Sequence, residues 1–207
     1  MQDSVTARLV SKGHNRLVFR RRVNVLAAEF AAALPPASSL LDIGCGDGTI
    51  SRLISQTVPG LSITGAEFLP RPECAIPCIG FDGVRLPFDD QSFDGCLFVD
   101  VLHHSRDPLG VLRDAARVSR GFVIIKDHAA ETAFQHRTLQ FMDWVGNRHH
   151  GVELPYKFLS RAQWLELYRD AGLEPVKVDE NIPLYPFPFS AVFGRQLHFI
   201  TLLRKIH

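Results

Sequence analysis

Hydrophobic residues along this chain follow two spacings, and the change from one to the other predicts where helices and strands lie. Near the N-terminus the spacing is helical, and the apolar stripe consists of Phe19, Val23, Leu26, Phe30 and Leu34. This stripe predicts an amphipathic helix over residues 14–34. Pro35 and Pro36 end the helix, because proline lacks the backbone N–H that a further turn would need.

Short apolar runs and helix-like segments then alternate. We expect helices over residues 48–56 and 107–117, and strands over residues 39–43, 61–66, 78–81, 95–102 and 121–125. The run over residues 95–102 is almost continuously apolar, as expected of a central strand buried on both faces. Alternation of this kind predicts an α/β fold with a mainly parallel sheet between two helical layers, a three-layer sandwich.

The last third of the chain departs from simple alternation. Residues 131–147 are expected to form an inserted helix, with Phe134, Thr138, Phe141 and Val145 on one side. A second helix is expected to begin after Ser160 as its N-cap and to end near Gly172. Residues 175–179 and 197–203 have the pattern of strands with no helix between them, which predicts an antiparallel C-terminal hairpin.

The composition is that of an ordinary globular domain. Of 207 residues, 46% are hydrophobic and 22% are charged, and the formal net charge is +1. We expect a single domain over residues 1–207, with an N-terminal helical segment (1–36), a ligand-binding half (37–128) and a substrate-side part (129–207). The balanced charge predicts no nucleic-acid partner, since such a partner would usually require a basic face.

The cysteines and apolar runs bear on location. Cys45, Cys74, Cys78 and Cys96 do not form a disulfide framework in a chain of this size, and no second ligand pair accompanies Cys74 and Cys78. We therefore expect free thiols and no metal site. No apolar run reaches the ~18 residues that would span a bilayer. These features predict a cytoplasmic protein without a transmembrane segment.

A glycine-rich turn follows the first predicted strand. Leu40 and Leu41 lead into Asp42, and the sequence then reads Ile-Gly-Cys-Gly-Asp-Gly up to Gly48. Glycine lets the backbone turn sharply and approach a ligand closely. The helix that follows presents free N–H groups, which suit an anionic group such as a carboxylate or phosphate. The turn alone would also suit a dinucleotide-binding domain.

Two further motifs distinguish this chain from a dinucleotide-binding domain. The run from Phe81 to Asp94 reads Phe-Asp-Gly-Val-Arg-Leu-Pro-Phe-Asp-Asp-Gln-Ser-Phe-Asp, and Val-Leu-His-His ends at His104 before Asp107-Pro108. Together with residues 42–46, these motifs resemble class I S-adenosylmethionine-dependent methyltransferases of the small-molecule type. The resemblance covers most of residues 38–128. It implies a seven-stranded, Rossmann-like sheet that closes with an antiparallel hairpin.

The resemblance also implies a set of cofactor-binding residues. Asp42 would orient the ammonium group of S-adenosylmethionine, and the backbone around the turn would approach its methionine part. Glu67 would accept hydrogen bonds from the ribose hydroxyls, although a dinucleotide site would use an acidic residue there as well. Asp82 would accept from the adenine amino group. The remaining predicted members of the site are Gly44, Cys45, Gly46, Phe68, Gly83, Val99, Asp100 and His103.

The sequence gives a weaker signal for the residues that would bind the methyl acceptor. His104 and His149 are the candidate catalytic residues, because histidine can act as a base near neutral pH. A structural role for His103 and His104 is an equal alternative. Plausible lining residues of the acceptor pocket are His128, Trp144, His150, Tyr156 and Phe158. Residues 129–196 carry no motif that identifies the acceptor.

The favoured function is methyl transfer from S-adenosylmethionine to a small molecule by in-line displacement, in a monomer or homodimer. Two alternatives stay open: a non-catalytic cofactor-binding module that acts through a protein partner, and a nicotinamide-dependent oxidoreductase. The apolar segment 183–193 could cover substrate, pack on a second subunit or touch a membrane, and the sequence does not choose among these roles.

Overall fold

The computed structural model describes residues 20–147, 156–194 and 196–206. Their centre is one seven-stranded sheet with the strand order β3-β2-β1-β4-β5-β7-β6. The strands are β1 (Ser39–Ile43), β2 (Ser62–Glu67), β3 (Cys78–Gly80), β4 (Phe93–Val99), β5 (Ser119–His128), β6 (Leu173–Asp179) and β7 (His198–Lys205). Pairings among β1 to β5 are parallel, and β7 pairs antiparallel with both β5 and β6. The predicted α/β sandwich with its antiparallel hairpin is confirmed.

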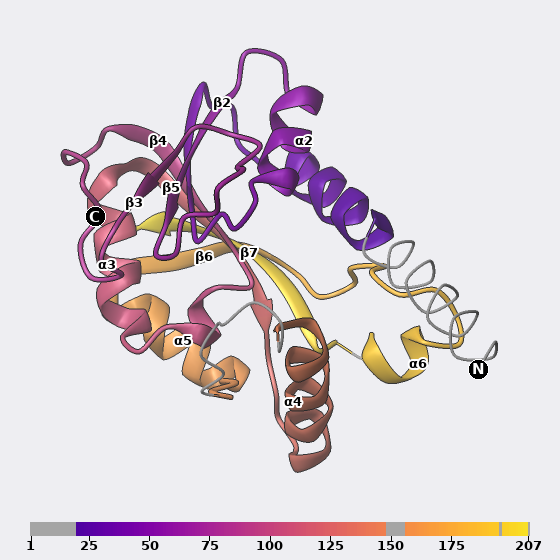
Figure 1. The fold of residues 1–207 in the computed structure, drawn as a ribbon. Coiled ribbons are helices and arrows are strands. Elements are labelled where there is room, and N and C mark those ends of the chain that lie inside the picture. The colour runs from indigo at the N-terminus through magenta and orange to yellow at the C-terminus, as the bar shows by residue number, and fades with distance from the viewer. Residues whose placement is uncertain (1–19, 148–155, 195, 207) are drawn as a thin grey trace.

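Helices cover both faces of this sheet (Figure 1). A helix over residues 20–33 and α2 (Thr49–Thr57) lie on one face, and α3 (Pro108–Val118) and α5 (Arg161–Asp170) lie on the other. Each face of the sheet has its own hydrophobic core, and neighbouring residues of β1 point into different ones. Leu40 packs with Phe30 and Ile54 on one face, whereas Leu41 packs with residues of α3 and α5 on the other. Burial on both faces explains why the central strands have continuous apolar runs.

The N-terminal helix is confirmed for residues 20–33, and residues 14–19 of the prediction lie outside the described residues. Val23, Leu26 and Phe30 of its apolar stripe are buried. The helix ends before Pro35, as expected from the missing proline N–H.

Several predicted boundaries were wrong by a few residues. The strand predicted over residues 95–102 extends too far, because β4 ends at Val99. A short 3-10 helix, η1 (Leu102–His104), begins at the last residue of the predicted strand. Asp100 has a φ of 57°, a left-handed conformation outside the extended region of strands. The change in backbone direction at this residue coincides with the end of β4.

The hairpin between β6 and β7 is not a simple one, because the four-residue helix α6 (Ser190–Phe193) lies between its strands. The prediction that no helix lies between these two strands was therefore wrong. Four residues are too few to show a helical period, and the segment before α6 is rich in proline (Pro183, Pro186 and Pro188), which does not favour a helix.

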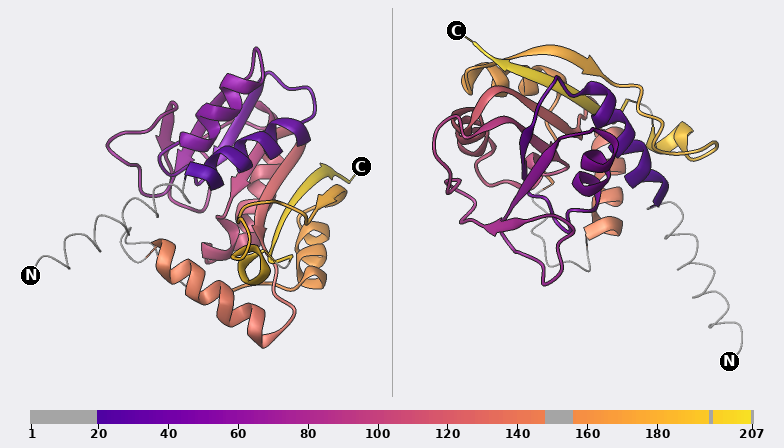
Figure 2. Two further views of the ribbon diagram at one scale, coloured as in Figure 1. Left: turned by 90° about the vertical axis from the view of Figure 1, so that its right-hand side faces the viewer. Right: turned by 90° about the horizontal axis from the view of Figure 1, so that it is seen from above.

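The inserted helix α4 (Ala133–Asn147) extends beyond the sheet from the end of β5 (Figure 2). It starts two residues later than predicted, because the Gln135 side chain accepts from the backbone N–H groups of Glu131 and Thr132. Phe134, Phe141 and Val145 do share a face, and that face is exposed. Leu139 and Asp143, on another side of α4, are the buried positions.

Candidate functional site at the carboxyl end of the sheet

The glycine turn follows β1 and holds three left-handed residues, with φ values of 74° at Gly44, 58° at Gly46 and 69° at Gly48. A side chain at Gly44 would lie 2.6 Å from a methyl carbon of Val101, in the segment that follows β4. Gly44 is therefore required both for its backbone conformation and for close packing. This contact joins the turn after β1 to the chain after β4.

Asp42, the last polar residue of β1, is buried beneath this turn. Ser51 Oγ donates to its Oδ2 at 2.6 Å, and no described group donates to its Oδ1. Burial raises the pKa of Asp42 to about 7, although the Ser51 hydrogen bond opposes this shift. A buried carboxylate oxygen without a donor favours a cationic ligand, since such a ligand would supply the missing charge and hydrogen bond.

Glu67, at the end of β2, already contacts the glycine turn. Its Oε2 accepts from the Gly46 backbone N–H at 2.7 Å, and its Oε1 accepts from the Leu69 N–H at 3.3 Å. The carboxylate is thus held at the edge of the turn. A carboxylate in this position has lone pairs that suit the two hydroxyls of a ribose.

Asp82 and Gly83 lie in the loop after β3, next to Phe68. The Asp82 carboxylate accepts from the N–H groups of Val84 and Arg85 at 2.8 and 2.9 Å, which lowers its pKa. A side chain at Gly83, which has a φ of 78°, would touch the Phe68 ring at 3.3 Å. Phe68 itself is 60% exposed. An exposed ring beside a carboxylate and a glycine forms a platform of the kind that a planar heterocycle could cover.

The chain after β4 carries a charged network that the sequence did not reveal. The carboxylate of Asp100 accepts from Lys126 of β5 and from Arg22 of the N-terminal helix. Burial would raise the pKa of Asp100, but these two cations hold it well below its usual value. Val99 and Asp100 were predicted for their backbone carbonyls. The Asp100 side chain holds three elements together, and the role of the carbonyls stays a prediction.

Two neighbouring histidines have different protonation states. His103 Nδ1 lies 2.6 Å from Asp127 Oδ1, with both side chains buried. Burial would lower the pKa of His103, but the Asp127 carboxylate raises it to about 10, so His103 is cationic. The pKa of His104 is lowered, first by burial and then by the His103 charge. His104 Nε2 lies 3.5 Å from Asp143 Oδ1 on α4.

The neutral His104 and its surroundings indicate the acceptor side. Phe158 packs against His103 with ring centroids 5.5 Å apart, and against His128 at 6.0 Å. Burial and the Lys126 cation lower the pKa of His128 to about 4, so that its ring is neutral as well. A neutral imidazole can accept a proton, but a pKa near 4 makes His128 a weak base, which leaves His104 as the better candidate.

The remaining acceptor-side predictions have mixed outcomes. His149 and His150 lie outside the described residues. Trp144 is 45% exposed on α4, and Tyr156 packs near the small core that contains Phe158. Sequence reasoning missed Asp127, Asp143, Lys126 and Arg22. Asp127 and Lys126 belong to a strand with no motif, and only their charges within an apolar run could have marked them.

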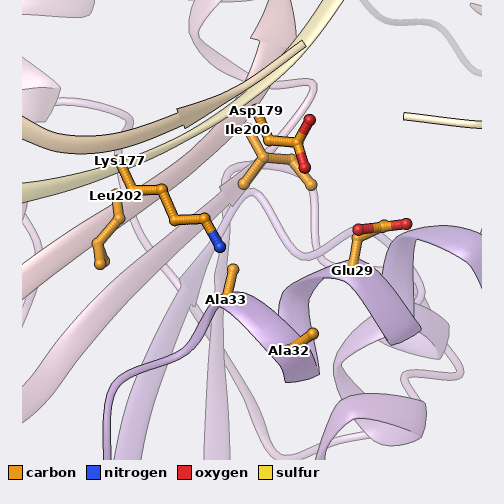
Figure 3. A pocket seen from close by; sticks show the side chains of 7 residues that line it. All are labelled: Glu29, Ala32, Ala33, Lys177, Asp179, Ile200 and Leu202. Carbon is orange, nitrogen blue, oxygen red and sulfur yellow. The ribbon is translucent and has the colours of Figure 1, made fainter. Parts of the chain in front are cut away.

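A separate shallow pocket lies between the N-terminal helix and the β6–β7 hairpin (Figure 3). In this view Lys177 reaches toward Ala33, and Glu29 and Asp179 flank the opening. The other lining residues are Ala32, Ile200 and Leu202, and none of the seven was predicted as a site residue. The candidate site at the glycine turn is therefore distinct from this pocket, with which it shares no residue.

Fold and site together define a class: α/β proteins with a seven-stranded sheet, an acidic glycine turn after β1, an acidic residue at the end of β2 and another after β3. A family model described as a methyltransferase domain matches residues 14–178. The chain belongs to this family of S-adenosylmethionine-dependent methyltransferases, and its cofactor is S-adenosylmethionine.

Known relatives and structures agree with this assignment. The chain is 26% identical to cycloartenol-C-24-methyltransferase 1 of Oryza sativa over 83% of its own length and 56% of the relative's. It is 29% identical to 27-O-demethylrifamycin SV methyltransferase of Amycolatopsis mediterranei, covering 79% and 64%. Its fold matches the methyltransferase in complex with the Trm112 activator of Haloferax volcanii, with a TM-score of 0.72, 19% identity, and coverage of 95% and 96%.

The chain spans about half the length of the curated relatives it matches. Among the described residues no helix is both long and apolar enough to cross a membrane. Family membership sets aside the nicotinamide-dependent oxidoreductase that the glycine turn alone had left open.

Proposed function

We propose that this protein transfers the methyl group of S-adenosylmethionine to a small organic acceptor by in-line displacement. The observation that carries the proposal is the segment from Val99 to His104. It contacts the glycine turn through Val101 and Gly44, and it places His103 and His104 against β5 and α4. Cofactor-binding and proton-accepting groups therefore meet at one edge of the sheet.

The residues at the carboxyl ends of β1 and β2 and in the loop after β3 fit this cofactor. Asp42 offers a buried carboxylate oxygen to its ammonium group, and Glu67 offers a carboxylate to its ribose. Phe68, Asp82 and Gly83 form an exposed platform for its adenine. Cys45 contributes backbone between the two glycines that approach the methionine part. When bound, the cofactor supplies a methyl group already activated by a sulfonium, so the protein's main task is alignment.

On the acceptor side, the neutral His104 would take the proton of an acceptor hydroxyl or acidic carbon. His103 is a cation held by Asp127, so it positions η1 instead of accepting a proton. His149 remains a predicted catalytic residue. The two relatives named above act, by their names, on cycloartenol and on a demethylrifamycin. The apolar character of these two acceptors supports an apolar acceptor for this protein as well.

Calorimetric titration with S-adenosylhomocysteine, alongside NAD, tests the cofactor site directly. We expect micromolar binding of S-adenosylhomocysteine only. Asp82→Asn separates two roles of this residue, because asparagine keeps one oxygen for the Val84 and Arg85 N–H groups but turns an NH₂ toward the adenine amino group. Binding should weaken at least tenfold, by about 1.4 kcal/mol.

Asp89→Asn is the matched control for that variant, since Asp89 is an exposed carboxylate of the same loop. Equal affinities of the folded Asp82 variant and the wild type would refute the adenine assignment. Asp82→Ala should weaken binding too, but it also removes the acceptor of the turn.

Catalysis is tested by release of labelled methyl groups into apolar hydroxylated acceptors. Replacing His104 with alanine should lower kcat by about 10²- to 10⁴-fold while the affinity for S-adenosylhomocysteine stays unchanged. Full turnover in this variant would remove His104 from the mechanism. Cofactor binding without any methyl transfer would favour the alternative of a binding module that acts through a partner.

A further inference from the structure

Three of the four cysteines converge beside the glycine turn. Cys45 belongs to that turn, Cys74 to the connection after β2, and Cys78 is the first residue of β3. Their Sγ atoms all lie within 4.8 Å of one another, and those of Cys45 and Cys78 are 3.5 Å apart. The sequence showed only the Cys74 and Cys78 pair. Parallel pairing of β1, β2 and β3 adds the third thiol.

Two glycines make room for this cluster. A side chain at Gly65, in the middle of β2, would lie 2.4 Å from Cys45 Sγ. One at Gly48 would lie 2.9 Å from Cys74 Sγ. Neither sulfur could keep its place if the neighbouring glycine had a side chain. The thiols thus occupy space that the surrounding backbone leaves open for them.

We propose that Cys45, Cys74 and Cys78 form a three-thiolate site for a thiophilic metal ion such as Zn²⁺. A Zn–S bond of about 2.3 Å places tetrahedral sulfur ligands about 3.8 Å apart. The separations here surround that value, so side-chain rotation alone can bring three sulfurs onto one ion. Three protein ligands leave a fourth position for water or another ligand.

A bound metal ion would supply the positive charge that three neighbouring thiolates need, since the ion stabilises its coordinating thiolates directly. Each thiol would release its proton to water when the ion binds, and no electron is transferred. Cys45 lies between Gly44 and Gly46, so a bound ion would also anchor the cofactor turn.

Cadmium is the probe of choice, because thiolate ligands give Cd²⁺ an ultraviolet charge-transfer band that histidine and carboxylate ligands do not. The full-length, reduced protein is titrated with Cd²⁺ without cofactor or its analogues. We expect one equivalent to give the thiolate band, and Zn²⁺ to compete for the same site. Cys74→Ser should lose at least tenfold in affinity together with about a third of the band intensity.

Cys96→Ser serves as the control, since Cys96 is buried elsewhere, against the Ala115 carbonyl, and should leave the titration unchanged. Cys78→Ser is a second test of the cluster if Cys74→Ser folds poorly. A wild-type protein without the band, or a folded cluster variant with wild-type affinity and band, would overturn the proposal. Because no cofactor is present, this result is independent of the proposed methyl transfer.

Discussion

At the scale of single residues, Asp42 is a carboxyl that should change its protonation when the cofactor binds. Its pKa is about 7 in the folded protein, because it is buried with one oxygen lacking a donor. An ammonium group beside it would lower that pKa, so binding would release a proton at neutral or acidic pH.

Affinity for S-adenosylhomocysteine should therefore rise with pH between about 5.5 and 7.5, by up to about tenfold per unit below the pKa. In Asp42→Asn both the affinity and most of its pH dependence should be lost. Calorimetry in buffers of different ionisation enthalpy measures the released proton. A flat profile for the wild type would mean that Asp42 does not face the ammonium group.

Gly44 illustrates how two constraints can act on one residue. Gly44→Ala would combine left-handed strain with a contact 2.6 Å from Val101, and we expect it to cost about 2–3 kcal/mol of unfolding free energy. Gly60→Ala is the matched control, because Gly60 has a φ of 78° but nothing within 4 Å of the added carbon. It should cost only about 1 kcal/mol.

Urea denaturation of both variants separates the cost of the left-handed backbone from the cost of the contact with Val101. The double variant Gly44→Ala with Val101→Ala should recover part of the lost stability, since it removes the clashing methyl groups. Equal costs at Gly44 and Gly60 would show that packing against the segment after β4 is unimportant.

At the scale of elements, α3 holds the loop that carries Asp82. The Arg117 guanidinium donates to the carbonyls of Phe88 and Leu86 at 2.8 and 3.1 Å and to Asp114 at 2.6 Å. Asp114 accepts in turn from the Leu86 N–H. Two side chains of α3 thus satisfy backbone groups of this loop that have no partner in a helix or strand.

Arg117→Lys should therefore weaken S-adenosylhomocysteine binding several-fold and lower the unfolding free energy by about 1–2 kcal/mol, because lysine cannot present a planar fork of donors. Arg113→Lys is the control on the same helix, since Arg113 donates only to the Asp170 carbonyl among the contacts of the described residues. Calorimetry and thermal melting measure the two effects. Similar cofactor affinities for both variants would contradict the role assigned to Arg117.

The elements that the sequence predicted best are those with a local cause. Ser160 caps α5 through a capping box with Gln163, and Pro35 follows a helix that ends at residue 33. The end of β4 was missed because the left-handed Asp100 depends on Lys126 and Arg22, which are distant in sequence. Likewise the motifs indicated the cofactor edge, whereas the Asp127 and Asp143 contacts arise only from the folding of β5 and α4 over η1.

At the scale of the whole molecule, the buried His103 and Asp127 pair should make stability depend on pH. The folded pKa of His103, about 10, exceeds the unfolded value of about 6.5. The stabilisation is therefore fully present below pH ~6.5 and is lost as pH rises toward 10. Asp127 stays ionised throughout this range, because its own pKa is lowered, chiefly by the His103 cation against the effect of burial.

We expect the unfolding free energy of the wild type to fall relative to that of His103→Gln between about pH 6.5 and 8.5. Titration of the thiols, which begins toward the upper end of this range, affects both proteins equally and cancels in the difference. Denaturant titrations at several pH values give the difference, with His136→Gln on α4 as a control variant. A difference that stays constant across this range would show that His103 is not charged in the folded protein.

The position of β7 in the sheet has a consequence for synthesis. Although β7 comes last in the described chain, it lies between β5 and β6. While the ribosome still holds residues 198–205, β6 has no strand to pair with, and β5 presents an open edge. Until residues 198–205 emerge, the nascent chain therefore carries one unpaired strand, β6, and one open edge on β5, which pairs only with β4. A chaperone or a neighbouring nascent chain could occupy both during this period.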